Sequence, residues 1–302
     1  MLKKIFGTWL AFAAIGGIIG FLLYPRLARR AKFWSEEAVK VSKGGYVPPA
    51  PTYLHAVITR FLCIAFGFLE VGPIKIVGKR RLPDKGPTII APLHVDAGDA
   101  SIVSALLGIK PMYYLIRTTE VIGWRGYLAA MTGAIAVDEE SQEGRSKAFK
   151  AAIEALVNGG PNVCMVIFPQ GEIIANEVVR RHDFKSGTMS LARIAARKRK
   201  EPIWIVPVGI HYKSDPQEGT LFQLLVERLG FSKFRNLFGQ RNYGAHAVVG
   251  HPLQVTPKIR DLDLVVRAHT LDDDAENATD TYVKRLKILQ KAATRGSPYQ
   301  GR

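Results

Sequence analysis

The distribution of apolar and polar residues divides the chain into an apolar N-terminal stretch and a longer part in which short apolar runs alternate with amphipathic ones. Short apolar runs bounded by Gly, Pro or charged residues are typical of buried strands, and apolar residues at helical spacing indicate helices. The pattern predicts strands at residues 74–77, 88–91, 112–116, 134–137, 163–168, 203–210 and 247–250. It predicts helices at residues 101–107, 149–157, 188–200 and 276–293.

The alternation of these strands and helices predicts an α/β fold, with a mixed, largely parallel sheet flanked by helices. The chain has 302 residues, of which 47% are hydrophobic, and this is enough for one large domain or two small ones. We expect a membrane anchor at residues 1–34, a linker with an apolar helix at residues 35–72, and the main domain at residues 73–302. That domain is expected to end in a basic helix.

The first apolar stretch, residues 5–24, contains no charged side chain. As a helix rising about 1.5 Å per residue, it would span roughly 30 Å, the thickness of the hydrocarbon core of a bilayer. We favour a transmembrane anchor over a cleaved signal peptide, because a basic cluster follows where a small-residue cleavage site should lie. A helix lying on the membrane surface is a third interpretation. The excess of basic residues after this stretch predicts a single-pass membrane protein with its C-terminal domain in the cytoplasm.

A second apolar stretch, residues 53–71, follows a Gly- and Pro-rich linker at residues 43–51. His55 and Arg60 interrupt this stretch, which makes it a poor membrane span. It is expected to form a helix that either lies against the membrane or packs on the main domain, and the sequence leaves both interpretations open.

The chain carries a formal net charge of +16, which calls for an anionic partner. Nucleic acid, an anionic membrane surface and negatively charged substrates such as coenzyme A would each satisfy this charge. The two cysteines, Cys63 and Cys164, both lie in apolar runs, so neither a disulfide framework nor a cysteine-based metal site is indicated. The histidines lack the spacing of metal ligands, so no metal site is predicted.

His94 is the strongest candidate for a general base. It follows a predicted strand, and the end of a strand is a usual place for catalytic residues on an α/β scaffold. A neutral imidazole can take a proton from a hydroxyl, and a carboxylate bonded to its other nitrogen holds the ring and stabilises the imidazolium. Asp99 is placed for that role, and Asp96 is close enough to take it instead. A second His-x-x-x-x-Asp match, at His269 and Asp274, has no strand before it and is interpreted as the start of a solvated helix.

Four sequence blocks follow one another in the main domain. The first is an apolar strand running into His-x-x-x-x-Asp, and the second is a Gly-Trp pair followed by a strand that ends in Asp. The third is a Phe-Pro-x-Gly loop with a Phe-Lys-Ser-Gly segment downstream, and the fourth is a strand containing Val-Pro-Val. The blocks lie at residues 89–99, 123–138, 168–187 and 205–209. This ordered set resembles the glycerolipid acyltransferases of the lysophosphatidic acid acyltransferase family.

The resemblance implies an enzyme of phospholipid or glycerolipid biosynthesis that transfers a fatty acyl group by single displacement. His94 would deprotonate the hydroxyl of a membrane lipid acceptor while Asp99 holds the imidazole, and the hydroxyl would attack the thioester of acyl-CoA or acyl carrier protein. The thioester is a co-substrate, and no cofactor is implied. Residues expected to bind substrate lie in and after the third block: Gln170, Gly171, Glu172, Arg180, Arg181 and Lys185.

The chain departs from the family pattern at positions associated with the phosphate of a glycerol-phosphate acceptor. Glu139 stands where the second block usually carries an arginine, and Gln170 and Ile173 stand where the third block usually carries a glutamate and an arginine. The loss of both arginines weakens the electrostatic case for a phosphorylated acceptor, so an uncharged lysolipid or a glycolipid is the alternative. The basic residues of the following loop could replace the lost charge, or they form a solvated basic turn.

A function from another class is a non-catalytic, membrane-tethered basic protein that binds anionic lipid or nucleic acid. Its support is the net charge, with basic runs at residues 79–81 and 197–200. The chain lacks the aromatic interleaving of single-strand binders and any helix-turn-helix or zinc motif, so nucleic acid is the less favoured partner. This interpretation leaves the four ordered blocks unexplained. A serine hydrolase of the α/β-hydrolase type is also disfavoured, because the chain has no Gly-x-Ser-x-Gly elbow.

Overall fold

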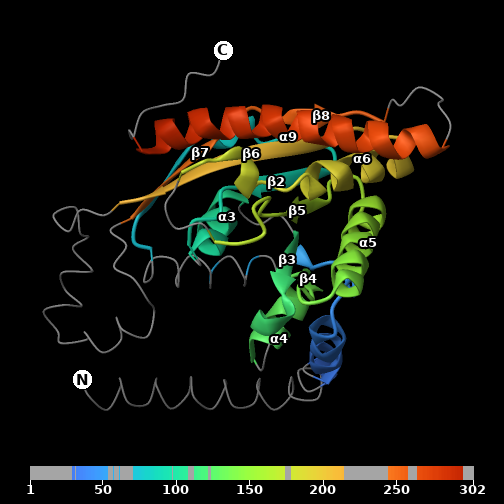
Figure 1. Cartoon of the computed structure of the whole chain (residues 1–302). Coiled ribbons are helices and arrows are strands. Elements are labelled where there is room, and N and C mark those ends of the chain that lie inside the picture. The colour runs from blue at the N-terminus through green and yellow to red at the C-terminus, as the bar shows by residue number, and fades with distance from the viewer. Residues whose placement is uncertain are drawn as a thin grey trace, which may run out of the picture.

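The architecture is a single sheet with helices packed on it (Figure 1). The computed structural model describes residues 29–30, 32–53, 57, 61, 71–96, 98–107, 112–121, 124–173, 178–213, 244–257 and 264–294. Strands and helices alternate along most of this length. The predicted α/β fold, with a mixed, largely parallel sheet flanked by helices, is therefore confirmed.

Eight strands form the sheet in the described part of the chain, in the order β1-β7-β6-β2-β5-β3-β4, with β8 paired to β6. Neighbouring strands run parallel, except that β6 pairs antiparallel with both β7 and β8. The strands are β1 (Ile74–Val77), β2 (Thr88–Pro92), β3 (Tyr113–Arg117), β4 (Ala134–Val137), β5 (Cys164–Val166), β6 (Ile203–Tyr212), β7 (Ala245–Val249) and β8 (Leu253–Val255).

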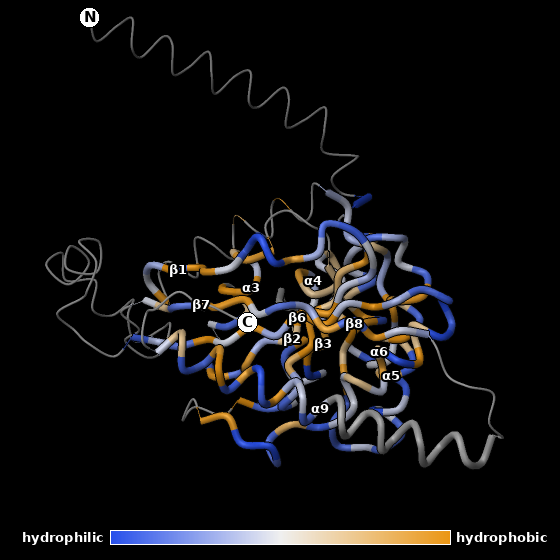
Figure 2. Tube along the Cα trace, turned by 90° about the horizontal axis from the view of Figure 1, so that it is seen from above, coloured by the Kyte–Doolittle hydropathy of each residue, from blue (hydrophilic) through white to orange (hydrophobic). Residues whose placement is uncertain are grey.

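The strand that leads to His94, β2, lies between β5 and β6 and is buried at every position. Its sequence, TIIAP, is apolar without polar alternation, as expected for a strand covered on both faces. Figure 2 shows apolar stretches concentrated in the central strands, with hydrophilic stretches toward the outside. The hydrophobic effect thus fixes β2 in the centre of the sheet, and residues that follow it begin from a rigid support.

Helices cover both faces of the sheet. The helix α9 runs across one face and packs on β6, β7 and α6, whereas α3 lies on the other side (Figure 1). The helix α5 packs against α6 and β4, and α4 packs against β4. The helices are α3 (Asp99–Leu107), α4 (Trp124–Met131), α5 (Gln142–Asn158), α6 (Gly187–Arg199) and α9 (Leu264–Thr294), with short 3-10 turns η1 (Lys79–Arg81), η2 (Thr118–Glu120) and η3 (Arg181–Asp183).

The C-terminal helix α9 is held directly against the central strands. The buried hydroxyl of Tyr282 donates to the carbonyl oxygen of Ala91 in β2 over 2.6 Å, and burial raises the pKa of this hydroxyl. At Gly209 in β6 the two backbones come so close that a Cβ atom would lie 2.8 Å from the carbonyl carbon of Leu289 and 2.9 Å from the amide nitrogen of Gln290. The absence of a side chain at Gly209 therefore sets how closely α9 approaches the sheet.

A second, smaller apolar cluster lies beside β4. A helix at residues 32–42 buries Trp34 and Val41 against residues of α4 and β4. The segment that follows it runs along the same strand, because the amide of Gly45 donates to the carbonyl of Ala136 over 2.9 Å. The helix extends across residue 34, where the predicted anchor meets the predicted linker, and it packs on the domain.

The predicted strands are all present, with ends that agree within two residues. Two helices begin earlier than predicted, α5 at Gln142 and α9 at Leu264. The first turns of α5 are polar, and three consecutive aspartates interrupt the apolar spacing of α9. Ser141 caps α5 by accepting a hydrogen bond from the amide of Gly144. His269 lies inside α9, so the interpretation of this segment as a helix start is wrong. The sequence pattern missed α4 and β8.

None of the helices among the described residues is both long and apolar enough to cross a membrane. The predicted anchor at residues 5–24 lies outside the described residues, and so does most of the second apolar stretch. Within that stretch the structure describes Tyr53, Val57 and Phe61, whose side chains are exposed, and Val71, which is buried. The four-residue spacing of the three exposed residues is that of one helix face.

The close approach of α9 to β6 predicts that Gly209→Ala lowers the free energy of unfolding by about 1–3 kcal/mol, because the new methyl group meets backbone atoms that cannot move aside easily. Urea unfolding of the purified protein in detergent measures this change. Gly187→Ala is the matched control, since a Cβ atom there meets nothing within 4 Å. The control should leave stability within about 1 kcal/mol of the parent or raise it. Equal midpoints for the two variants would contradict the packing described.

Candidate active site

His94 lies at the end of the central strand, where the chain leaves the sheet. The amide of Leu93 still donates to the carbonyl of Val208 in β6 over 2.9 Å, so the pairing of β2 and β6 continues to the residue before His94. Leu93 and Val95 are both buried, and His94 between them keeps 20% of its side chain exposed. Successive side chains point to opposite sides of an extended backbone. The buried side chains of Leu93 and Val95 therefore hold the chain in place, and the imidazole between them stays accessible.

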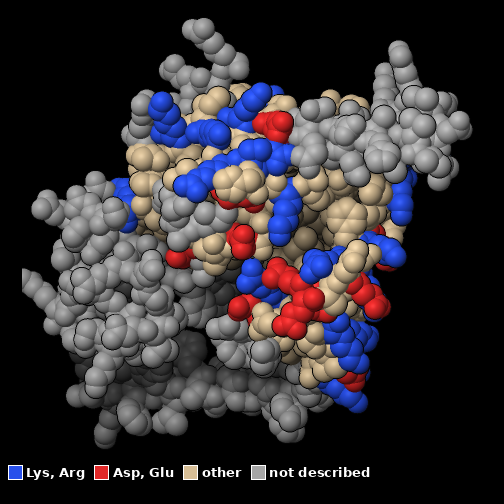
Figure 3. Space-filling model, viewed as in Figure 1, with Lys and Arg blue, Asp and Glu red and all other residues tan. Residues whose placement is uncertain are grey.

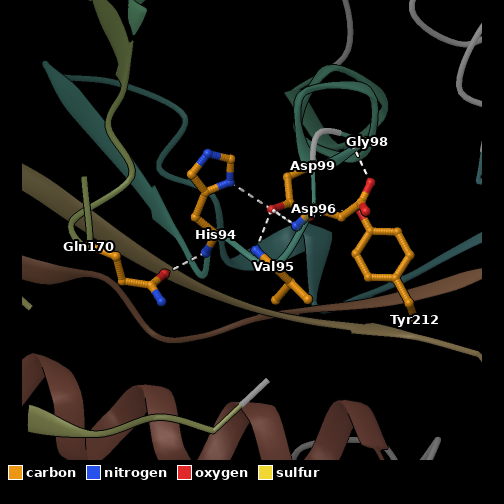
Figure 4. Close-up of polar contacts among 7 residues, drawn as sticks. All are labelled: His94, Val95, Asp96, Gly98, Asp99, Gln170 and Tyr212. Carbon is orange, nitrogen blue, oxygen red and sulfur yellow. Dashed lines mark hydrogen bonds and ion pairs between the residues drawn. The ribbon is translucent and has the colours of Figure 1, made fainter. Parts of the chain in front are cut away.

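His94 and Asp99 form a hydrogen-bonded pair (Figure 4). The Nδ1 atom of His94 lies 2.9 Å from Oδ2 of Asp99, whose side chain is fully buried. The same oxygen accepts hydrogen bonds from the amides of Val95, over 2.6 Å, and Asp96, over 3.0 Å. Because a carboxylate only accepts, Nδ1 carries the proton and Nε2 keeps its lone pair. The structure thus brings these two residues together, and their catalytic role stays a prediction.

Asp96, which the sequence left open as the partner of His94, has a different contact. Its Oδ1 atom accepts from the amide of Gly98 over 2.8 Å and so closes the turn before α3. A Cβ atom at Gly98 would lie 2.6 Å from Val71, so the turn has room for glycine alone. Asp99 is the residue that orients the imidazole.

Tyr212 is part of the pair's surroundings and was missed by the sequence analysis. Its hydroxyl donates to Oδ1 of Asp99 over 2.7 Å, and Tyr212 is the last residue of β6. The strand order would have indicated Tyr212, because the parallel neighbours β2 and β6 end at the same edge of the sheet. Sequence spacing carries no such signal, since Tyr212 is far from Asp99 along the chain.

The third block covers one face of the imidazole. The ring of Phe168 stacks on the ring of His94 with centroids 4.0 Å apart and planes 21° apart. The side chain of Gln170 accepts a hydrogen bond at Oε1 from the amide of His94 over 2.5 Å. Both contacts restrain His94 from a segment that is distant in sequence.

Gln170, expected to bind substrate, is 1% exposed. Its Nε2 atom has no hydrogen-bond partner among the described residues and points away from the imidazole in Figure 4. Its observed contact is thus with the His94 backbone, and its predicted contact with substrate stays a prediction.

Gly171, Glu172 and Ile173 form an exposed turn directly after Gln170. Gly171 has φ of +76°, a left-handed conformation that glycine adopts without strain. A Cβ atom on it would lie 3.3 Å from Nζ of Lys185, so the lysine side chain extends over the turn. Glu172 and Lys185 are exposed, as expected of residues that meet a ligand, and their role in substrate binding stays a prediction.

Arg117, at the end of β3, is a second residue that the sequence analysis missed. Its Nε atom lies 2.8 Å from a carboxylate oxygen of Glu139, and its Nη2 atom lies 3.4 Å from the carbonyl oxygen of Gly171. Both side chains of the ion pair are about half exposed. The carboxylate at Glu139 thus neutralises an arginine that reaches the third-block turn.

The two arginines of the basic turn have different surroundings. Arg180 is exposed. Arg181 forms an ion pair with Asp280 of α9 and donates to the carbonyl of Phe184 over 2.9 Å. Phe184 in turn packs edge-to-face on Tyr282, with ring centroids 5.9 Å apart. Arg181 therefore helps to hold the third-block segment against α9, and substrate binding by either arginine stays a prediction.

Asp138 closes the second block and caps its loop. The hydroxyl of Ser141 donates to Oδ2 over 2.7 Å, and the amide of Glu140 donates to Oδ1 over 3.1 Å. These hydrogen bonds hold the pKa of Asp138 below its usual range, with the Ser141 hydroxyl as the largest cause.

No group of three His, Cys, Asp or Glu side chains in the described part of the chain is arranged to hold a metal ion.

Part of the chain is similar to a known family. Residues 73–211 match the family model described as Acyltransferase. None of the curated proteins matches the chain. A solved structure that is similar is the 1-acyl-sn-glycerophosphate (LPA) acyltransferase PlsC from Thermotoga maritima, with 16% identity, 76% of this chain and 80% of that chain covered, and a TM-score of 0.41. The matched residues include His94, Asp99 and all four blocks, and this part of the chain is therefore an acyltransferase domain.

Proposed function

We propose that this protein transfers a fatty acyl group from a thioester, acyl-CoA or acyl carrier protein, to a hydroxyl of a lysophospholipid or related lipid in a membrane. The observation that carries this proposal is the His94–Asp99 pair, in which one imidazole nitrogen is held by a buried carboxylate and the other has its lone pair available. The match of residues 73–211 to the Acyltransferase model supports acyl transfer in lipid metabolism, and the donor and acceptor classes are part of the proposal.

The proposed reaction is a single displacement. The acceptor hydroxyl gives its proton to Nε2 of His94 as its oxygen bonds to the thioester carbon. The carbon–sulfur bond then breaks, and the thiolate takes the proton from the imidazolium, which yields an ester and a free thiol. Asp99 stabilises the imidazolium that exists between these two proton transfers. The stacked ring of Phe168 restricts imidazole rotation, so the base stays oriented toward the acceptor.

The surface supports a reaction at a membrane. The exposed side chains of Tyr53, Val57 and Phe61 offer an apolar stripe that can enter the interface between lipid and water. Figure 3 shows Lys and Arg side chains gathered where α9 lies, with Asp and Glu gathered lower on the same face. Basic side chains near an anionic leaflet contribute about 1 kcal/mol each to its binding. Together with the anchor predicted at residues 5–24, these features would hold the domain at a cytoplasmic membrane surface.

A second candidate is an acyltransferase for an acceptor without a phosphate, such as a glycolipid. It is favoured by the ion pair of Arg117 and Glu139, because the guanidinium that reaches the third-block turn already has a carboxylate partner. A phosphate would have to compete with Glu139 for this arginine, whereas a neutral acceptor requires no free cation.

Removal of the base should abolish most of the activity. We expect His94→Ala to lower the rate of acyl transfer by about 10²- to 10⁴-fold, because general base catalysis is lost while substrate positioning remains. Transfer of labelled acyl groups to a panel of lysolipids by the full-length protein in membranes measures this rate. His251→Ala is the matched control, since His251 is an exposed histidine between β7 and β8, and it should keep the parental rate. Unchanged transfer by His94→Ala would refute the proposed mechanism.

The charge of Glu139 should govern the choice of acceptor. We expect Glu139→Gln to raise the ratio of transfer to lysophosphatidate over transfer to monoacylglycerol by about 3- to 10-fold, because Arg117 loses its counter-charge and can pair with phosphate. Glu140→Gln is the control, since this exposed neighbour makes no ion pair in the described part of the chain. Parental transfer to neutral acceptors alone would support the second candidate, and an unchanged ratio in Glu139→Gln would show that the ion pair does not select the acceptor.

A further inference from the structure

We propose that Tyr212 is a positioning residue for the catalytic pair, acting on His94 through the carboxylate of Asp99. The inference rests on the proposed role of His94 as general base. Tyr212 lies one residue beyond the family match, and none of the four blocks includes it. Its hydroxyl contacts Oδ1 of Asp99, which is the carboxylate oxygen that does not contact the imidazole.

The two oxygens of Asp99 have different sets of donors. Oδ2 accepts from His94 Nδ1 and from the amides of Val95 and Asp96, all of which belong to the loop before α3. Oδ1 accepts from Tyr212, which belongs to β6. Donors on one oxygen alone leave the carboxylate able to turn about its Cβ–Cγ bond. The Tyr212 hydroxyl fixes the second oxygen and hence the plane in which Oδ2 faces the imidazole.

Burial makes this contact necessary. The side chain of Asp99 is fully buried and Tyr212 is 8% exposed, so water has little access to Oδ1. A Cβ atom at Gly98 would lie 3.2 Å from the Tyr212 hydroxyl, which means that the turn before α3 closes over the same contact. Without the hydroxyl, a buried carboxylate oxygen would lack its donor, and the carboxylate would turn to find another.

The position of Tyr212 follows from the register of the sheet. Pro92 at the end of β2 pairs with Val208 of β6, and β6 continues for four more residues beyond this pair. The extension carries Tyr212 past the end of β2 to the level of the first turn of α3, where Asp99 lies. Residues on that extension also pair with β7, which keeps the tyrosine in place independently of the His94 loop.

The test is Tyr212→Phe, which keeps the ring and removes the hydroxyl. We expect kcat to fall by about 10- to 100-fold, the range for a lost hydrogen bond to a charged group, with KM for donor and acceptor unchanged within about 2-fold. Purified full-length protein in detergent is assayed with labelled acyl-CoA and the acceptor that the parent uses best. Tyr114→Phe is the matched control, because it also removes a tyrosine hydroxyl bond, the one to Thr132, away from His94. The control should keep the parental kcat.

A double-mutant cycle separates positioning from a general structural effect. If Tyr212 acts through Asp99, Tyr212→Phe should cost less than about 3-fold in an Asp99→Asn background, because the carboxylate it orients is already gone. A purely structural role predicts the same fold loss in both backgrounds, and that result would overturn the inference. The proton resonance of the Nδ1–H bond in histidine-labelled protein gives a second readout, expected to shift in Tyr212→Phe and to stay in place in Tyr114→Phe.

The outcomes for the two proposals are distinguishable. Parental kcat and an unshifted resonance in Tyr212→Phe, alongside an inactive His94→Ala variant, would overturn the role of Tyr212 and leave the proposed function standing. A fully active His94→Ala variant would remove the proposed function, and the role of Tyr212 would fall with it.

Discussion

The buried charge of Asp99 is the constraint on which the arrangement of the site depends. A carboxylate removed from water is costly unless donors surround it, and here the donors are two amides of its own loop, the imidazole of His94 and the hydroxyl of Tyr212. The amides define the turn, the carboxylate orients the imidazole, and the Tyr212 hydroxyl connects the turn to β6. The side chain of Asp99 thus contacts its own loop, His94 and a distant strand.

The sheet explains why these groups meet. Because β2, β5 and β6 run parallel, the segments that follow β2 and β5 and the last residues of β6 all reach the same edge. The third-block segment then closes over His94 with a stacked ring and a side-chain acceptor, and α9 supports both that segment and β2 through Asp280 and Tyr282. The helix lies beyond the family match, yet it contacts the strand that leads to His94.

Individual residues show how far sequence reasoning reached. His94 and Asp99 were found because five residues of chain can bring them together locally, and the order of blocks singled them out. Gln170 was assigned to substrate binding, and the structure instead gives its side chain a contact with the His94 backbone. Arg117 and Tyr212 were missed because nothing in their neighbouring residues distinguishes them from other polar residues at strand ends. Glu139 was identified from the sequence as a departure from the family pattern. Its partner, Arg117, follows only from the pairing of β3 with β4 in the structure.

The sequence by itself determined the α/β class, the strands and the pairing of His94 with Asp99, because hydrophobic periodicity and short-range spacing are local properties. The tertiary structure decided which polar residues surround that pair. Asp99 receives donors from α3's leading turn and from β6, His94 receives contacts from the third block, and Arg117 receives its counter-charge from beyond β4. The contacts of Arg117 with Glu139 and of Tyr212 with Asp99 join residues 22 and 113 positions apart. Strand order, which no local pattern encodes, brings these residues within hydrogen-bonding distance.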